Sequence, residues 1–211
     1  MKESGLSQVE LYADNGDAKL MVCGLSYLDM FYELQKKTQV LPKDIPLNDT
    51  EVYLSFQESE IQGFHRENTE EIIRILNPQN FTEFTNVCGV LSSAGVWDNN
   101  DTKFLTDNRH NLSSIGTFRE DIFASVMSYG ITEKDAFEIT KKIIRGWLCK
   151  KDEESMKILQ LLRSKSVPER YINYLAKIRY LYPKSKAIFD AQNIVKLAWY
   201  KLKFPREYKP N

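Results

Sequence analysis

The sequence predicts a mainly α fold with at most a short strand near the N-terminus. Apolar side chains recur at a spacing of three or four residues along most of the chain, which is the period of an amphipathic helix. Residues that cap helices precede many of these stripes. The 211 residues are 42% hydrophobic, enough to bury a sizeable core, and we expect one domain over residues 1–211.

In the first half, one short apolar run at Lys19–Gly24 is the candidate strand. Helical stripes follow Ser26 and Asn68, and Asn68 with Glu71 has the spacing of a capping box. The stretch Ser92–Asn111 is rich in Ser, Gly, Asn and Asp, so we expect a loop there.

In the second half, Thr117 and Glu120 repeat the capping-box spacing before another apolar stripe. Proline is tolerated in the first turn of a helix, where its missing N–H has no partner to lose. Further helices are therefore expected to begin near Thr132, Asp152, Pro168 and Pro183.

The net charge of zero conceals an asymmetry. Residues 1–105 carry 8 Lys/Arg against 17 Asp/Glu, and residues 106–211 carry 21 against 12. The acidic subregion 1–105 and the basic subregion 106–211 suggest a polyanion-facing surface in the second half, although helical surfaces also collect lysine. Aromatic residues interleave with the late cations, which favours nucleic acid or phosphates: Tyr171, Tyr174, Tyr180, Tyr182, Trp199 and Tyr200.

Several classes of protein are disfavoured by the composition. Cys23, Cys88 and Cys149 are far apart, and His65 and His110 are the chain's two histidines, so we expect no metal and no cofactor. No stretch approaches the apolar length of a membrane helix, and we expect a reduced, cytoplasmic protein with no membrane partner. The sequence contains no common nucleophile, zinc or phosphate-loop motif, and we expect no catalytic residue.

Ordered motifs along nearly the whole chain are similar to one known family. They include F-R-E-D-I, G-I-T-E-K-D-A-F-E-I, V-P-E-R-Y-I and K-I-R-Y-L-Y-P-K-S-K-A between Thr117 and Phe204. Upstream, L-P-K-D-I-P-L-N-D-T-E-V and F-T-E-F-T-N-V-C-G-V-L-S at Phe81–Ser92 belong to the same order. Together they resemble the fingers region of PolC-type DNA polymerase III, the replicative alpha subunit.

The resemblance implies a helical fingers module whose cations hold the triphosphate of an incoming nucleotide. Guanidinium groups and helix N-termini suit phosphate oxygens. Carried over by motif, the resemblance implies a nucleotide- or phosphate-binding role for Arg119, Arg145, Lys177, Arg179 and Lys184. Lys186, two residues after Lys184, is added to these candidates as a further cation.

Departures from the family pattern argue against an intact nucleotide site. Lys186 stands where the family has a histidine, and Asp190 where it has a tyrosine. The R-K-G-K-G pattern becomes R-G-W-L-C from Arg145, which removes a lysine. The 211 residues also lack the palm aspartates that would hold two catalytic metals.

Three hypotheses follow. The first is a diverged, stand-alone fingers-like protein, non-catalytic on its own, that binds DNA weakly and without sequence preference or binds a replication component. The second is an interaction mimic that modulates a replicative polymerase or another replication protein. The third is the fingers subunit of a split DNA polymerase, which the eroded nucleotide site disfavours. We favour the first.

Overall fold

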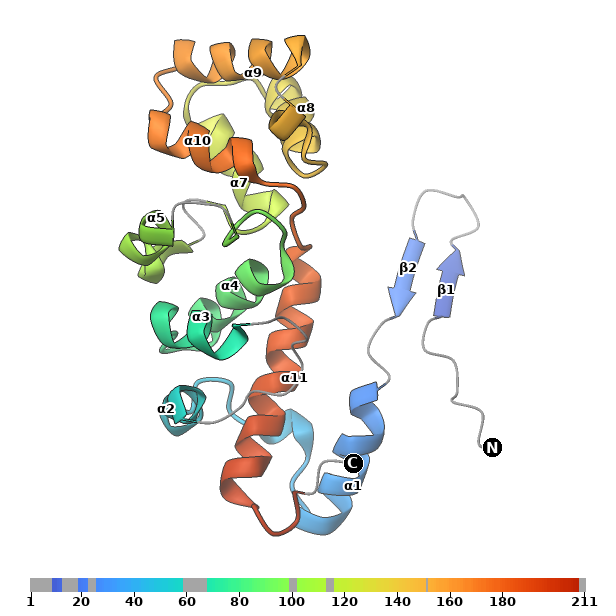
Figure 1. The fold of residues 1–211 in the computed structure, drawn as a ribbon. Coiled ribbons are helices and arrows are strands. Elements are labelled where there is room, and N and C mark those ends of the chain that lie inside the picture. The colour runs from blue at the N-terminus through green and yellow to red at the C-terminus, as the bar shows by residue number, and fades with distance from the viewer. Residues whose placement is uncertain are drawn as a thin grey trace. The chain divides into compact units, whose positions relative to one another are not determined.

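Helices dominate the chain, which confirms the mainly α prediction. The computed structural model describes residues 9–12, 19–22, 26–58, 68–98, 102–112, 116–150 and 152–208. In these ranges the α-helices are α1 (Ser26–Thr38), α2 (Thr50–Glu58), α3 (Thr69–Leu76), α4 (Phe81–Ser92), α5 (Thr102–Asp107), α7 (Arg119–Ser128), α8 (Glu133–Ile143), α9 (Glu153–Ser164), α10 (Glu169–Lys177) and α11 (Lys184–Lys203) (Figure 1). Short 3-10 helices are η1 (Pro42–Asp44), η2 (Arg109–Asn111) and η3 (Trp147–Lys150).

Two short strands near the N-terminus pair with each other. Strands β1 (Val9–Tyr12) and β2 (Lys19–Val22) are antiparallel, with Val9 opposite Val22 and Tyr12 opposite Lys19. Strand β2 lies in the expected apolar run, but the sequence predicted at most one strand here and missed β1. A lone strand leaves its backbone groups unpaired, so the second strand supplies the missing hydrogen-bond partners.

The chain divides into two compact units. Unit 1 takes in the described residues of Met1–Pro46 and Lys196–Asn211, and unit 2 those of Leu47–Val195. The boundary falls inside α11, between Val195 and Lys196. Because one continuous helix belongs to both units, the division does not contradict a single domain over residues 1–211, which stays a prediction.

Unit 1 has a small aromatic and aliphatic core. Phe31 and Leu34 of α1 are buried together with Leu197 and Tyr200 from the C-terminal end of α11. The Tyr200 hydroxyl donates a 2.6 Å hydrogen bond to the carbonyl oxygen of Val40. The bond gives the one polar group of this buried ring a partner, as buried hydroxyls require.

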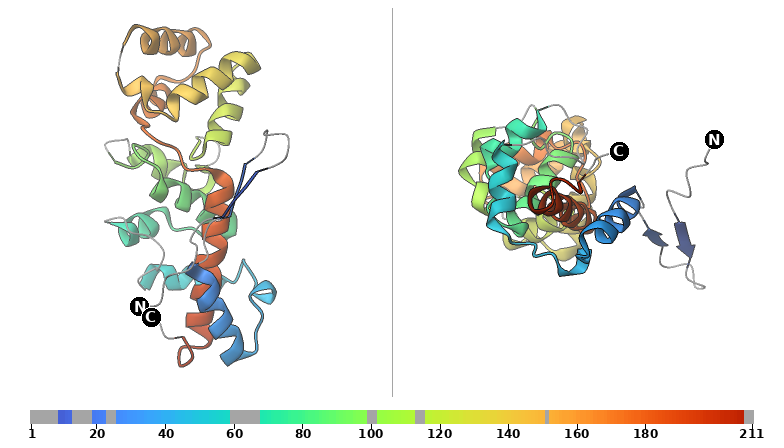
Figure 2. Two further views of the ribbon diagram at one scale, coloured as in Figure 1. Left: turned by 90° about the vertical axis from the view of Figure 1, so that its right-hand side faces the viewer. Right: turned by 90° about the horizontal axis from the view of Figure 1, so that it is seen from below.

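In unit 2, α4 forms the centre of one group of helices. Every residue from Phe84 to Leu91 is buried, so α4 is enclosed around its whole circumference. On its N-terminal end, Phe56 of α2 stacks on Phe84 with ring centroids 4.7 Å apart, and Tyr53 packs edge-on against both rings. Figure 1 and the left view of Figure 2 show α7–α10 as a second group beyond α3–α5.

The second group is built from helices that contact their neighbours in the chain. Helices α7 and α8 pack against each other, while η3 contacts α8, α9 and α10. The Tyr174 hydroxyl of α10 donates a 2.9 Å hydrogen bond to the carbonyl oxygen of Gly116, just before α7. This buried bond fixes the start of α7 against α10.

Helix caps agree with the sequence at some positions and differ at others. The side chains of Thr132 and Asp152 accept hydrogen bonds from backbone N–H groups and cap α8 and α9, as expected. Asn68 makes no side-chain cap bond, because it adopts a left-handed conformation with φ of 64°. Thr117 does not cap α7 either: Phe118 occupies the cap position, and Thr117 is buried one residue earlier.

The stretch Ser92–Asn111 is only partly a loop, so that prediction is corrected. It contains α5 and η2 among its described residues. Phe104 and Leu105 are buried, and the Phe104 ring lies 5.4 Å from the ring of Tyr174. The helix is stabilised by these two apolar contacts, which a composition dominated by polar residues conceals.

Candidate nucleic-acid interface

The α10–α11 connection (residues 178–183) is held in unit 2 by an isolated antiparallel bridge between Ala94 and Tyr180. The N–H of Ala94 donates to the carbonyl of Tyr180 at 3.0 Å. In return the carbonyl of Ala94 accepts from the N–H groups of Arg179 and Tyr180, at 2.8 and 3.1 Å. The Ser93 hydroxyl accepts from the N–H of Tyr182 at 3.0 Å. Four hydrogen bonds therefore fix the backbone of a segment that has no regular secondary structure.

Two glycines allow this close approach. Gly95 has φ of +78°, and a Cβ added there would lie 2.1 Å from the carbonyl oxygen of Lys177. Gly146, with φ of +67°, also lies close to the connection: a Cβ added there would lie 3.0 Å from the Cα of Arg179. Both positions need glycine for conformation and for space. The turns at Gly95 and Gly146 thus both pack closely against the backbone of the α10–α11 connection.

The side chain of Cys149 also contacts the backbone at the end of α10. The thiol of Cys149 lies 3.1 Å from the carbonyl oxygen of Ala176 and 3.3 Å from that of Ile178, as a donor to both. These carbonyls belong to the end of α10, where helix carbonyls lack intrahelical partners. Cys149 is therefore packed as a structural thiol, in agreement with the sequence, which gave it no histidine partner.

Three of the predicted phosphate-binding cations lie on or next to the α10–α11 connection. Lys177 and Arg179 flank Ile178, whose side chain is fully buried, and both are exposed. Arg145 is also exposed and precedes Gly146, which contacts Arg179. None of the described residues forms an ion pair with these three side chains. The structure therefore brings Arg145, Lys177 and Arg179 to one rigid part of the surface.

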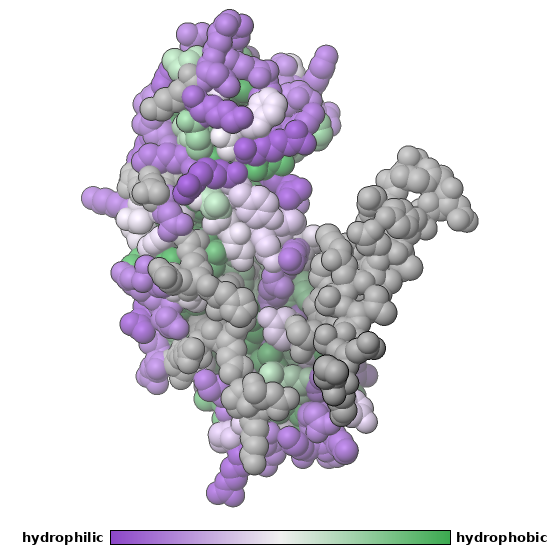
Figure 3. All heavy atoms as spheres, turned by 45° about the vertical axis from the view of Figure 1, so that its right-hand side comes forward, coloured by the Kyte–Doolittle hydropathy of each residue, from purple (hydrophilic) through white to green (hydrophobic). Residues whose placement is uncertain are grey.

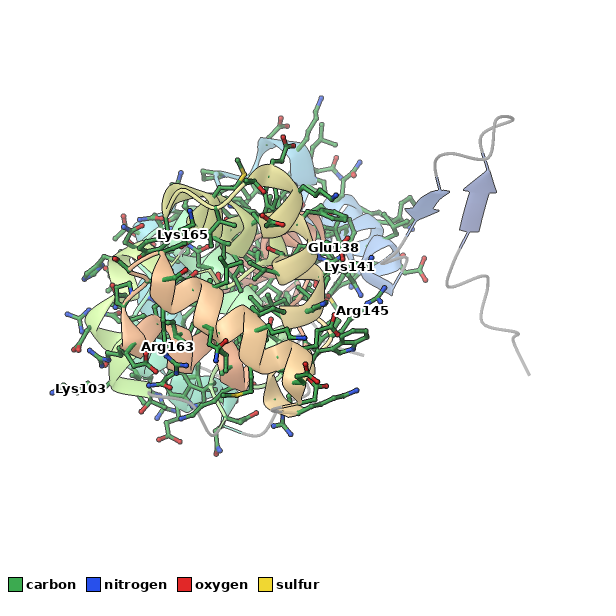
Figure 4. The ribbon with its side chains drawn as sticks, turned by 90° about the horizontal axis from the view of Figure 1, so that it is seen from above. Lys103, Glu138, Lys141, Arg145, Arg163 and Lys165 are labelled. Atoms are coloured by element: carbon green, nitrogen blue, oxygen red, sulfur yellow. The ribbon has the colours of Figure 1, made fainter. Side chains whose placement is uncertain are left out.

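Figure 4 shows one of these cations, Arg145, apart from several other basic residues of unit 2. It labels Arg145 on the same side of the upper helices as Lys141 and Glu138, and Lys103, Arg163 and Lys165 on the opposite side. Arg163 is neutralised there by a two-bond contact with Glu169, at 3.0 and 2.7 Å. Figure 3 shows hydrophilic residues covering the upper helices α8 and α9.

Lys184, unlike the three exposed cations, forms an ion pair within the protein. Its ammonium group lies 2.8 Å from Oδ1 of Asp121 and 5.7 Å from the centre of the Phe118 ring. The Asp121 side chain is only 9% exposed, and burial raises the pKa of that carboxyl, while the bond to Lys184 partly opposes the rise. The pair joins the first turn of α7 to the first turn of α11. Lys184 is therefore partly neutralised within the protein.

Arg119 lies two residues before Asp121, at the first position of α7. Its side chain is half-buried, and its Nε has no hydrogen-bond partner among the described residues. The Thr117 hydroxyl and Oδ2 of Asp121 are likewise buried without one. Lys184 thus pairs with a carboxylate that sequence reasoning did not single out.

Lys186 and Asp190, the two residues that depart from the family pattern, form a small cluster with Tyr182. The Lys186 ammonium lies 5.2 Å from the centre of the Tyr182 ring, and the Tyr182 hydroxyl donates a 2.7 Å hydrogen bond to Asp190. Burial, and then the bond to Asp190, raise the pKa of Tyr182 far above its usual range. Asp190 therefore accepts a bond from a neighbouring tyrosine on the same surface as Lys186.

The remaining titratable residues offer no obvious chemistry in the described part of the chain. His110 lies 3.7 Å from Glu83 and is exposed, and Cys88 is fully buried in α4. His65 and Cys23 lie outside the described residues. Within those residues no three His, Cys, Asp or Glu side chains are grouped as a metal site would need, and no helix has the length and apolarity to cross a membrane.

Comparison with known proteins gives one consistent result. The chain is 28% identical over 207 residues to "DNA polymerase III PolC-type" of Clostridium perfringens, which is 90% of this chain and 14% of that protein. It is 30% identical to the protein of the same name from Mycoplasma pneumoniae, again over 90% of the chain and 14% of the relative. The Streptococcus sanguinis protein is 26% identical over 92% of the chain and 15% of its own length. No family model matches the chain.

The chain thus spans about one-seventh of the length of these relatives. The phosphate-binding roles of the six cations stay predictions. The resemblance read from the motifs is confirmed: along about nine-tenths of its length this chain is similar to one segment of DNA polymerase III PolC-type.

Proposed function

We propose that this chain is a diverged fingers-like protein that binds DNA without sequence preference and does not polymerise nucleotides by itself. The observation that carries the proposal is the group of exposed cations, Arg145, Lys177 and Arg179, at a connection whose backbone is held by four hydrogen bonds. Cations of this kind bind phosphate groups whatever the base sequence. The similarity to a DNA polymerase supports DNA as the polyanion.

A free nucleotide is a poorer candidate ligand than the DNA backbone. Lys184 is bound to Asp121, and the Asp121 carboxylate would repel a triphosphate placed between Lys184 and Arg119. The exposed cations at the α10–α11 connection have no such competitor in the described residues. We therefore expect weak DNA binding to persist where tight binding of a free nucleotide is absent. A DNA ligand also agrees with the expected cytoplasmic location.

The test is the salt dependence of DNA binding in two charge-reversed variants. For duplex DNA, the logarithm of affinity falls with the logarithm of salt by about 0.9 for each phosphate neutralised. If Lys177→Glu with Arg179→Glu removes two contacts, the slope should become shallower by about 1.8. The measurement is fluorescence anisotropy of a labelled duplex over a series of salt concentrations.

Lys36→Glu with Lys37→Glu is the matched control, because both lysines are exposed but lie on α1 in the acidic subregion. This variant should bind as the wild type does. The wild type bound to primed DNA with magnesium and nucleotides should extend no primer. Equal binding by the two double variants, or no salt-sensitive binding by the wild type, would refute the DNA proposal.

A protein ligand is the second candidate. The excess of Asp and Glu in residues 1–105 suits a basic protein surface better than a nucleic acid. In this alternative the chain engages a polymerase or another replication protein and modulates it, or supplies fingers to a palm on another chain. Salt-insensitive DNA binding together with a specific complex with a purified replicative polymerase would favour it.

A further inference from the structure

The six aromatic residues that interleave with the late cations are not equivalent in the structure. Tyr171, Tyr174 and Tyr200 are buried, at 5%, 1% and 0% exposure. Tyr182 and Trp199 are half-buried, and the Tyr182 ring already faces the Lys186 ammonium. Tyr180 is 43% exposed. Of these six residues, Tyr180 is therefore the one that presents a large part of its ring to solvent.

Tyr180 is also held in place to an unusual degree for an exposed aromatic residue. Its N–H and its carbonyl both bond to Ala94, at 3.1 and 3.0 Å, so its backbone cannot rotate freely. The next residue, Leu181, is fully buried, and Ile178 on the other side is as well. A ring on a fixed backbone loses little conformational entropy when a ligand covers it.

Cations lie close to Tyr180 along the chain. Arg179 is its immediate neighbour and Lys177 lies three residues before it, and both are exposed. Two residues after Tyr180, the ring of Tyr182 lies 5.2 Å from the Lys186 ammonium. The Asp190 carboxylate is the acidic group in this cluster, and its Oδ2 accepts the hydrogen bond from Tyr182. The surroundings of Tyr180 are thus mainly positive.

From this arrangement we propose that Tyr180 is a stacking platform for an unpaired base, and that the preferred ligand is single-stranded DNA. The inference rests on the proposed DNA binding and deepens it. In a duplex the faces of the bases are covered by their neighbours, so an aromatic ring stacks on a base only where the strand is single. Lys177, Arg179 and Lys186 would hold the phosphates on either side of the stacked nucleotide.

The experiment compares three variants on single-stranded and duplex DNA. Tyr180→Ala removes the ring, Tyr180→Phe keeps it without the hydroxyl, and Tyr32→Ala removes a tyrosine that is 65% exposed beside Lys36 on α1. Stacking on one base is worth about 1–3 kcal/mol, which is roughly a 5- to 150-fold change in affinity. Far-UV circular dichroism should show that all three variants keep the wild-type helix content.

We expect Tyr180→Ala to lower the affinity for a labelled oligothymidine by that factor and to leave duplex affinity unchanged. Tyr180→Phe and Tyr32→Ala should bind as the wild type does. The salt dependence should be the same in all of them, because no charge is altered. An abasic oligonucleotide should bind the wild type as weakly as oligothymidine binds Tyr180→Ala.

Other results would overturn the inference, and they separate it from the proposed function. If the wild type binds single strands and duplexes with a steep salt dependence and Tyr180→Ala changes neither, the stacking inference fails while DNA binding stands. If Tyr180→Ala weakens both kinds of DNA equally, the ring is not a platform for unpaired bases. If the wild type binds no DNA, both proposals fail together.

Discussion

At the scale of single residues, the buried carboxylate of Asp121 sets the chemistry of the first turn of α7. Its Oδ1 pairs with Lys184, but Oδ2 is buried without a hydrogen-bond partner among the described residues. A carboxylate in this state costs free energy that a protonated or neutral side chain would not. The carboxyl therefore has a higher pKa in the folded protein than in the unfolded chain.

This pKa rise predicts how stability depends on pH. Because the folded state holds the Asp121 proton more tightly, the favourable contribution is complete below the pKa of the unfolded carboxyl, about 3.9, and is lost as pH rises through the raised pKa. Asp121→Asn should remove this component. Urea denaturation across pH should show the wild type losing free energy of unfolding relative to Asp121→Asn as pH rises from about 4.

A difference between the two proteins that is constant from pH 3.5 to pH 7 would contradict this account. Lys184→Met serves as a second check. Without the ammonium group the opposing effect on the pKa disappears, so the loss of stability with rising pH should extend to higher pH than in the wild type.

The same residues show what sequence reasoning reached and what it missed at this scale. The motifs singled out Arg119 and Lys184 together, and the structure connects the start of α7 to the start of α11. Asp121 lies inside the quoted F-R-E-D-I motif but was not singled out. An aspartate in the first turn of a helix is so common that its pattern carries no sign of burial or of a distant lysine.

At the scale of elements, the two turns that grip the α10–α11 connection depend on glycine. Gly95 and Gly130 offer a matched comparison, because both have positive φ, of +78° and +74°. A Cβ at Gly130 would meet nothing within 4 Å, whereas a Cβ at Gly95 would meet the carbonyl oxygen of Lys177 at 2.1 Å. The two positions share the conformational cost of a side chain and differ in the space for it.

Gly130→Ala should therefore lower the free energy of unfolding by about 1–2 kcal/mol, the usual cost of a left-handed non-glycine residue. Gly95→Ala should cost clearly more, because the Lys177 backbone must move as well. Urea denaturation measures both costs.

Gly95→Ala should also weaken DNA binding, while Gly130→Ala should leave it unchanged. Equal effects of the two substitutions on DNA binding would show that the close packing of the Gly95 turn against Lys177 does not position the cations.

Helix starts were predictable where a local signal is sufficient. Thr132, Asp152, Pro168 and Pro183 begin or immediately precede helices α8–α11, as expected. The signal failed at Asn68 and Thr117, where the local spacing was right but the backbone differs. Asn68 is left-handed, and the burial of Thr117 directs its hydroxyl away from the role of a cap. Tertiary packing determined both outcomes, and no local pattern reports it.

At the scale of the whole molecule, helix α11 belongs to both compact units. Its N-terminal part contributes Ala187, Ala191 and Ile194 to the buried residues of unit 2, and its C-terminal part contributes Leu197 and Tyr200 to the core of unit 1. Fraying of α11 at one end would remove its buried residues from the core of one unit. It would also destabilise the rest of the helix, which contributes to the core of the other unit. Unfolding of the two units should therefore be cooperative.

Lys196→Pro tests this coupling. Proline in a helix interior removes a hydrogen bond and costs about 3 kcal/mol or more, and Lys196 is the first residue of α11 assigned to unit 1. Single-tryptophan versions that keep Trp199 or Trp147 report on units 1 and 2 separately. The two probes should show one urea transition in the wild type and in Lys196→Ala, and two in Lys196→Pro. Separate transitions in the wild type would show that the shared helix does not couple the units.

The mainly α class was predictable at this scale because the apolar period recurs in most of the longer helices. The arrangement of the candidate interface was not. It depends on hydrogen bonds between Ala94 and residues 179–180 and on the approach of Gly95 to Lys177, which join distant parts of the chain. The resemblance to a polymerase segment named most of the cations, but only the structure distinguishes exposed Tyr180 from the five more buried aromatic residues.

The bridge between Ala94 and Tyr180 has a consequence for how the protein is made. On the ribosome Ala94 emerges well before Tyr180, and at about 5–20 residues per second the delay is roughly 4–17 s. Throughout that interval the turn at Gly95 exists without the backbone that it is shaped to receive. A nascent chain that ends before residue 178 can therefore contain the whole of α4 and still lack the surface that we propose binds DNA.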